Sequence, residues 1–308
     1  MTNPAVWDSM IHKNKPAPWL VYFLLSLSFY SISFVITPLA SALGNQSPAN
    51  TTPTTPTTSK IAIIIDDIGY NRPAGEFIIK VPGALTYAVI PFTPFGKKLA
   101  ELAHAKNKEV LLHLPMEATV HKKLDAGGLT INQSKYELKD LVNNSLSAVP
   151  HVTGFNNHMG SLLTTDRKAM EWIMEEASSK GIFFIDSFTN ANSIAGKVAS
   201  EHEIPNLRRD IFLDNNPSKS EIHKAFQLLL AKAKKNGYAI GIAHPHPATI
   251  KYLAENITKL ADENIELVSV STLVNAHWKP TEQPSKYRLA HKIASLPTPP
   301  HTRFRFVR

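Results

Sequence analysis

Residues 60–69 read KIAIIIDDIG, an apolar run that ends in two adjacent carboxylates and a glycine. The run Ile61–Ile65 is short and bounded by charged residues, as a buried strand of a parallel sheet would be. Seven more short apolar runs follow along the chain: Leu85–Ile90, Val110–Leu114, Val152–Phe155, Ile182–Ile185, Leu207–Leu213 (broken by charge), Tyr238–Ile242 and Ile265–Val270. The region from Lys60 to Trp278 therefore predicts seven or eight buried strands.

Helical stretches fall between most of these runs, and several carry start or stop signals. Ser134–Glu137 and Ser218–Glu221 each fit a capping box at the start of a helix. Gly181 and Gly237 stand where a glycine would end a helix, and Pro73 suits a first helical turn. The alternation predicts an α/β fold, either a parallel barrel or a doubly wound sheet. Both folds bind ligands at the carboxyl ends of their strands.

Polar side chains follow five of the predicted strands, at the edge where a ligand would bind. In chain order they are Asp66 and Asp67, His113 and Glu117, Asn157 and His158, Asp186, and His244 and His246. Each has a structural alternative, because aspartates cap helices, a histidine in an apolar run packs in the core, and histidines between prolines form rigid loops. Together, carboxylates and imidazoles at one edge are the ligands of a hydrolytic zinc site or a similar divalent site. The sequence carries no serine-nucleophile signature and no glycine-rich phosphate loop.

The combined motifs also resemble a known family. They are IDDIG at 65–69, LLHLPMEA at 111–118, NNHMGS at 156–161, FIDS at 184–187 and AHPHP at 243–247. In this order they are similar to the divergent polysaccharide deacetylase family, a remote branch of the polysaccharide deacetylases. The resemblance covers residues 60–278, which we treat as one domain. It implies a distorted (β/α) barrel of seven or eight units.

The resemblance assigns roles to individual residues at the strand ends. Asp66 matches the position of a catalytic base, and Asp67 matches that of a metal ligand. His158 matches the first of two metal-binding histidines, but Leu162 stands where the family's second histidine is expected. The metal site is therefore incomplete by this comparison alone.

The third metal ligand is left open by the substitution at Leu162. Either His113 or His244 could complete the set from a neighbouring strand, and we favour His244 for the metal, with His246 as the acid that protonates the leaving group. The resemblance implies a divalent metal, with zinc expected. The remaining polar residues of this edge are then expected to contact the substrate: His113, Glu117, Asn157 and Asp186.

The expected function is metal-dependent removal of acetyl groups from an envelope polysaccharide or peptidoglycan by an exported hydrolase. One alternative, favoured by Leu162, is a catalytically inactive glycan-binding or scaffold protein on the same fold. Another is a structural envelope protein that acts through its terminal segments.

The start of the chain predicts export. Residues 19–43 contain no charge, and at about 1.5 Å per residue such a helix could cross a bilayer core of about 30 Å. Lys13 and Lys15 precede this segment, and Ala40–Ala42 forms an A-x-A pattern that signal peptidase accepts. Residues 1–43 are therefore expected to be a signal peptide or an N-terminal membrane anchor. The product would be periplasmic, either soluble or attached to the inner membrane.

Two further segments are too polar to form a core. Residues 44–59, rich in proline and threonine, are expected to be a disordered linker, and residues 279–308 a disordered basic tail. The net charge of +8 does not indicate nucleic acid as a partner, because seven basic residues lie in the tail against Glu282 alone. The chain has no cysteine, so disulfides and thiolate metal sites are excluded.

Overall fold

The structure, a computed structural model, describes residues 58–120 and 122–280. The predicted leader at 1–43, nearly all of the predicted linker at 44–59 and the tail beyond residue 280 lie outside these ranges. Among the helices of the described ranges, none has the length and apolar character needed to span a membrane. The expectation of a membrane anchor concerns residues 19–43, which are not among them.

The described residues contain nine strands, and each of the eight predicted runs contributes at least one. The run at 207–213 supplies parts of two strands, because charged residues interrupt it. The last run ends as a strand at Leu267, and its remainder enters a helix. The strands are β1 (Ser59–Ile68), β2 (Thr86–Val89), β3 (Glu109–Met116), β4 (Val152–Met159), β5 (Phe183–Asp186), β6 (Asn206–Arg208), β7 (Ile211–Phe212), β8 (Tyr238–Ala243) and β9 (Ile265–Leu267).

All the strand pairs are parallel, in the order β6-β5-β4-β3-β2-β1-β8-β7, and β9 pairs with the start of β1. The two ends of this path are close in sequence, because only two residues separate β6 from β7. Arg209 N donates to the carbonyl of Asp186 on β5, and Asp210 N donates to that of Ile240 on β8. The chain therefore crosses here from one end of the sheet to the other. This curling confirms the predicted distorted parallel (β/α) barrel rather than a doubly wound open sheet.

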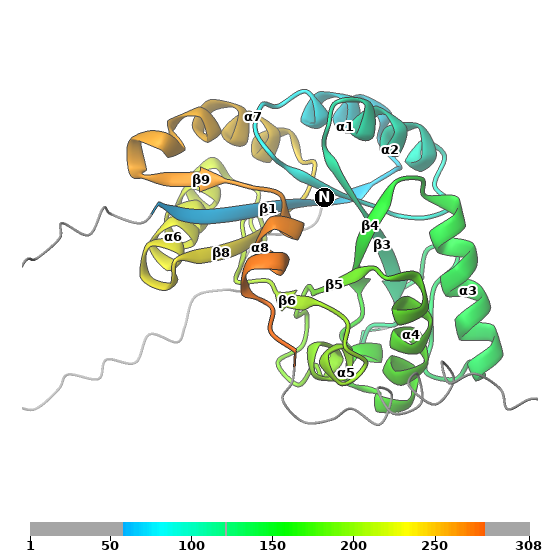
Figure 1. The fold of residues 1–308 in the computed structure, drawn as a ribbon. Helices are drawn as coiled ribbons and strands as arrows, with labels where there is room; N and C mark the ends of the chain where they lie inside the picture. Colours follow the sequence, from blue (N-terminus) through cyan, green and yellow to red (C-terminus); the bar gives the residue numbers. More distant parts are fainter. Residues whose placement is uncertain (1–57, 121, 281–308) are drawn as a thin grey trace, which may run out of the picture. The chain divides into compact units, whose positions relative to one another are not determined.

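The helices lie around the strands, apart from α8, which lies among them (Figure 1). The structure confirms the capping box at Ser134, the left-handed glycines Gly181 and Gly237, and proline in the first turn of α1. The box expected at Ser218 is wrong, since that side chain makes no capping bond. The helices are α1 (Arg72–Ile79), α2 (Gly96–Ala105), α3 (Lys135–Ala148), α4 (Arg167–Lys180), α5 (Ala195–Glu201), α6 (Lys219–Asn236), α7 (Pro247–Asn256) and α8 (Val270–His277), with 3-10 turns η1 (Leu163–Thr165) and η2 (Ile257–Glu263).

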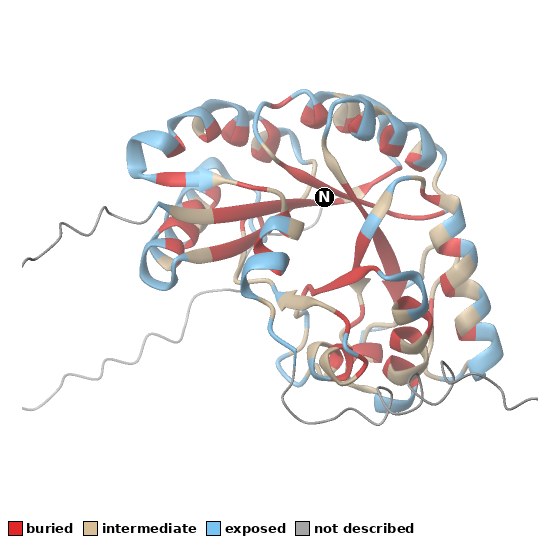
Figure 2. Ribbon diagram, in the orientation of Figure 1, coloured by how far each residue is buried: buried red, intermediate tan, exposed pale blue. Residues whose placement is uncertain are grey.

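Two apolar layers lie on the two faces of the curled sheet. Figure 2 shows the central strands mostly buried, whereas β6, β7 and β9 are partly exposed. On β1, alternate residues belong to different layers: Ile61, Ile63 and Ile65 join the layer under the outer helices, whereas Ala62 and Ile64 join the inner one. The inner layer also contains Leu273 and Val274 of α8. The interior of the barrel is thus filled with apolar side chains beneath the carboxyl ends of the strands.

The same alternation puts polar side chains directly above this inner layer. Asp66 continues the inward positions of β1, and His113 and His244 do so on β3 and β8. His113 is in register with Asn156 of β4, and Ile64 is in register with Ile242, two residues before Asp66 and His244. The carboxyl end of the barrel therefore carries a polar layer built by strand register.

Candidate metal centre

A bulge in β1 brings the second aspartate to the same end of the barrel as the first. Ile65 pairs with Tyr87 and Ile68 with Val89, so β1 has one residue more than β2 in this interval. Asp67 lies in the bulge with a left-handed φ of 57°. In a regular strand Asp66 and Asp67 would point to opposite faces. The bulge removes this constraint, which explains how both carboxylates serve one site.

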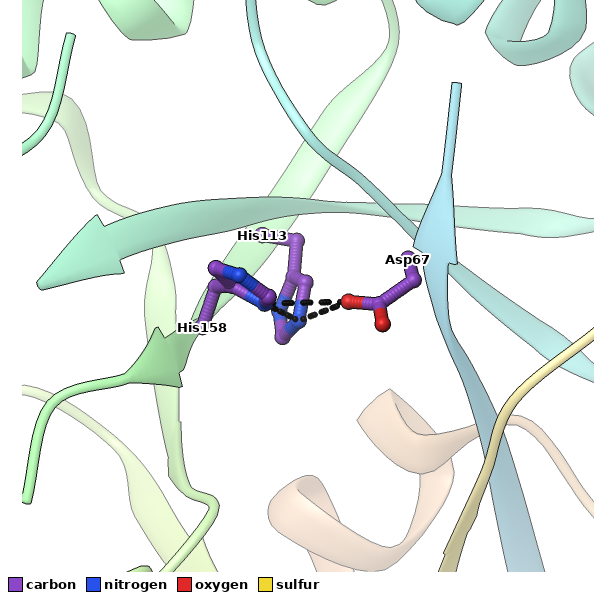
Figure 3. A group of neighbouring side chains, drawn as sticks. All are labelled: Asp67, His113 and His158. Atoms are coloured by element: carbon purple, nitrogen blue, oxygen red, sulfur yellow. Dashed lines mark hydrogen bonds and ion pairs between the residues drawn. The ribbon is translucent and has the colours of Figure 1, made fainter. Parts of the chain in front are cut away.

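Asp67, His113 and His158 converge from β1, β3 and β4, and Figure 3 shows the Asp67 carboxylate pointing toward the two imidazole rings. Asp67 Oδ1 lies 2.9 Å from His158 Nδ1 and 3.2 Å from His113 Nε2. The two ring nitrogens are 3.1 Å apart. The three atoms thus form a compact triangle with one donor from each of three strands.

The triangle has the properties of a divalent metal site. Ligands about 2.0–2.1 Å from a tetrahedral zinc ion are about 3.3–3.4 Å from one another, slightly more than the separations seen here. Asp67 Oδ1 is buried, and neither imidazole meets it with hydrogen-bond geometry. A buried carboxylate oxygen without a hydrogen bond is costly unless another partner is present. One oxygen and two nitrogens are also a donor set that zinc accepts, so these residues fit a zinc ion.

Asn156 accepts a hydrogen bond from Nδ1 of His113, the ring nitrogen that lies outside the triangle. His113 Nδ1 is 2.8 Å from Asn156 Oδ1, while Asn156 Nδ2 donates to Asp66 Oδ1 at 2.8 Å. Because the amide oxygen only accepts, Nδ1 carries a proton, and Nε2 is the nitrogen left to bind a metal ion. Burial would lower the pKa of His113, but Asp66 and Asp67 outweigh it and raise this pKa, so a proton occupies Nε2 readily when no metal is bound. Nε2 is the nitrogen in the triangle, so a metal ion bound there would leave the ring proton on Nδ1, facing Asn156.

The pKa values of the two adjacent aspartates are shifted in opposite directions. Asp66 is 2% exposed, and its burial raises the pKa of the carboxyl, although nearby His113 and His244 partly offset this rise. Burial acts in the same direction on Asp67, but the imidazoles of His113 and His158 outweigh it and hold the pKa of Asp67 far below its ordinary value. Asp67 therefore stays ionised beside the histidines, and Asp66 is the carboxyl that takes up a proton more readily.

A second group of possible ligands consists of Asp214, His244 and His246. Asp214 Oδ1 is 2.9 Å from His244 Nδ1, and Asp214 Oδ2 accepts from the His244 backbone and from Thr249. Burial would lower the pKa of His244, but the bond to Asp214 and the charge of Asp66 raise it to about 9. His244 is therefore held as an imidazolium at neutral pH. The ring of His246 is exposed.

The structure does not bring together all the residues expected at the site. His113, expected to contact substrate, lies with Asp67 and His158, whereas His244, favoured as the third metal ligand, pairs with Asp214. The other three residues expected to contact substrate accept hydrogen bonds from backbone N–H groups of neighbouring segments. The side chain of Glu117 accepts from Ile131 N, that of Asn157 from Ser187 N, and that of Asp186 from Phe188 N.

Three residues of the site were absent from the sequence-based assignment. Asn156 directly precedes Asn157 and His158, which were assigned to the site, and its role comes from its register with His113. Asp214 directly follows the predicted strand at 207–213, so the rule of polar strand ends could have found it. Asp125, whose Oδ2 lies 3.2 Å from His158 Nε2, is on a loop and no pattern marks it.

Comparisons with known proteins agree with this architecture. The divergent polysaccharide deacetylase family matches residues 63–274. An uncharacterized protein of Haemophilus influenzae is 36% identical over 215 residues (70% of this chain, 76% of that protein), and the uncharacterized protein YibQ of Escherichia coli is 32% identical over 249 residues (81% and 76%). The crystal structure of an uncharacterized Agrobacterium tumefaciens protein is similar with a TM-score of 0.68 and 22% identity, covering 70% of this chain and 89% of that one. Since the match spans most of the chain, this protein belongs to the divergent polysaccharide deacetylase family.

Proposed function

We propose that this protein is an exported, metal-dependent hydrolase that removes acetyl groups from an envelope polysaccharide or peptidoglycan. The observation that supports it best is the triangle of Asp67, His113 and His158, with a buried carboxylate oxygen that lacks a hydrogen bond. Membership of the deacetylase family supports the substrate class. The three side chains would hold a divalent ion, for which zinc is the best fit.

When bound, such an ion polarises a carbonyl group and lowers the pKa of water at the site. Asp66 lies beside the triangle, with Oδ2 3.6 Å from His113 Nε2, and has a raised pKa. A carboxylate of this kind accepts a proton from the attacking water more readily than an ordinary one. We assign it as the general base.

His244 is the better placed of the two candidate acids. It directly follows β8 and lies one residue beyond the pair Ile65–Ala243, as Asp66 does on β1, and Asp214 keeps its ring protonated and oriented. It can therefore give a proton to the amine or alcohol that leaves when the acetyl group is removed. The exposed ring of His246 lacks such a partner carboxylate at hydrogen-bond distance among the described residues. The sequence-based assignment of His246 as the acid stays a prediction that the variants of both histidines would test.

Release of acetate tests the proposed reaction directly. The full chain, supplied with zinc, is expected to release acetate from acetylated chitooligosaccharides or peptidoglycan fragments, and the His158→Ala variant is not. If the zinc-loaded wild type binds these glycans without releasing acetate, the protein is instead the inactive glycan-binding form of this fold.

The dependence of kcat/KM on pH should reveal the pKa of His244, which its bond to Asp214 raises. His244 acts as an acid only while protonated, so the rate should fall as pH rises through about 9, the pKa of His244. Asp214→Asn removes the main cause that raises this pKa, and the alkaline limb should move to lower pH. Asp262→Asn, at an exposed position, is the matched control. An alkaline limb that stays in place in Asp214→Asn would exclude His244 as the acid.

Export is proposed from residues 1–43. Sequencing the N-terminus of the protein purified from a periplasmic fraction should show a chain that starts just after Ala42 if the segment is a cleaved signal peptide. A protein that starts at residue 1 and sediments with membranes would indicate an anchor, and a full-length cytoplasmic protein would contradict export.

A further inference from the structure

The loop that follows β3 lies at the carboxyl ends of β1 to β4 and is firmly attached there. Its residues 122–131 are here called the strap. Leu129 N donates to Pro115 O and Glu117 N donates to Leu129 O, both at 2.9 Å. Ile131 N donates to the Glu117 side chain, also at 2.9 Å. These bonds, with the fully buried side chain of Leu129, hold the strap in one place.

The tip of the strap is shaped to present one carboxylate. Gly128 N donates to Asp125 O at 3.0 Å, which closes a turn. Gly127 within this turn has a φ of 79°, and a β-carbon there would lie 2.6 Å from the ring of Phe92. Only glycine fits this close approach without displacing the ring. Backbone and packing thus both determine where Asp125 lies.

The Asp125 carboxylate lies between two side chains. Its Oδ2 is 3.2 Å from His158 Nε2, and its Oδ1 accepts a hydrogen bond from the Tyr70 hydroxyl. This bond raises the pKa of Tyr70 to about 12, so the phenol remains a donor at neutral pH. Tyr70 comes three residues after Asp67, so its position is tied to the bulge that carries the metal-site carboxylate.

We propose that Asp125 is a positioning residue that holds His158 in the orientation and protonation pattern required of a metal ligand, with Tyr70 fixing the carboxylate. Each ring nitrogen of His158 faces one carboxylate, with Asp67 Oδ1 2.9 Å from Nδ1 and Asp125 Oδ2 3.2 Å from Nε2. When a metal ion takes Nδ1, the proton of the ring is on Nε2, where Asp125 lies beside it. The inference rests on the proposed function only because it names a metal ion. The contact between Asp125 and His158 is independent of that function.

The two histidines of the triangle are therefore supported in different ways. His113 is held by Asn156 within the barrel, where the amide is completely buried. His158 is held from outside the barrel, by a strap residue whose side chain is 22% exposed. A change in the strap should consequently weaken the site without disturbing the barrel core, which makes the role testable.

Two measurements on the full chain test the inference. In metal-free protein labelled with ¹⁵N-histidine, the nuclear magnetic resonance spectrum should show a proton on His158 Nε2 that exchanges slowly with water. The Asp125→Ala variant should lose this protected proton, and its dissociation constant for zinc should rise by about 10–100-fold, the usual effect of losing an outer partner of a metal ligand. Tyr70→Phe should change the protection of the proton and the zinc dissociation constant in the same direction, but to a smaller extent.

Asp262→Asn and Tyr136→Phe, at exposed positions, are the matched controls and should leave both measurements unchanged. Asp125→Asn, which keeps the shape of the side chain, should lie between wild type and Asp125→Ala. If Asp125→Ala remains folded and retains both the protected proton and the zinc affinity, the inference is wrong. If the wild type binds no zinc but the protected proton still depends on Asp125, the positioning role stands and the proposed metal chemistry fails.

Discussion

Replacing Asp67 with alanine is expected to abolish tight zinc binding and, with it, acetate release. The substitution removes the only oxygen of the triangle and leaves two neutral imidazoles to hold a doubly charged ion. Loss of an outer partner already weakens metal binding by about 10–100-fold, so loss of a ligand should exceed 100-fold. Calorimetric titration of the metal-free full chain with zinc measures the change.

Two histidine variants make this test specific for the proposed set of ligands. His113→Ala should weaken zinc binding about as strongly as Asp67→Ala, whereas His244→Ala should leave the zinc affinity nearly unchanged and lower only the catalytic rate. The reverse pattern, with zinc binding lost in His244→Ala and kept in His113→Ala, would show that His244 is the third ligand.

Asp66→Asn is the second substitution with a large expected effect, and it should separate catalysis from metal binding. The asparagine keeps an oxygen that accepts from Asn156 Nδ2, so the support of His113 is retained. It cannot take up a proton, and removal of a general base typically lowers the rate by about 10²–10⁴-fold. We therefore expect kcat to fall by this factor while the zinc dissociation constant stays close to that of the wild type.

The control for Asp66→Asn is Asp140→Asn, an exposed change on helix α3 that should leave both quantities unaltered. A kcat within tenfold of the wild type in Asp66→Asn would mean that another group accepts the proton. A large loss of zinc affinity in the same variant would instead make Asp66 part of the metal site.

Much of the fold could be predicted because buried parallel strands have a strong local pattern. Each apolar run from Ile61–Ile65 onward contains a strand, and the helix signals at Ser134, Gly181 and Gly237 are confirmed. The split of the run at 207–213 into two strands was not predicted. The charged residues mark where the run is interrupted, but the pairing of its two parts with β5 and with β8 depends on the curling of the sheet, which the local sequence does not show.

The composition of the site was less predictable, because it depends on register and on loops. His113 and His244 both continue the inward-facing positions of β3 and β8, so periodicity cannot distinguish them. What separates them is the neighbour across the sheet: His113 is beside β4, which carries His158, and His244 is beside Asp214. Asp67 reaches the triangle only through a bulge, and Asp125 reaches His158 only through the strap. Neither feature has a local signal in the sequence.

The proposed hydrolase requires that Asp67, His113 and His158 together bind one metal ion. Anomalous X-ray diffraction at the zinc edge from crystals of the zinc-loaded protein tests it most directly. The expected result is a single strong peak about 2.0–2.2 Å from Asp67 Oδ1, His113 Nε2 and His158 Nδ1. A peak held by Asp214, His244 and His246, or no peak at the triangle in zinc-saturated crystals, would contradict it.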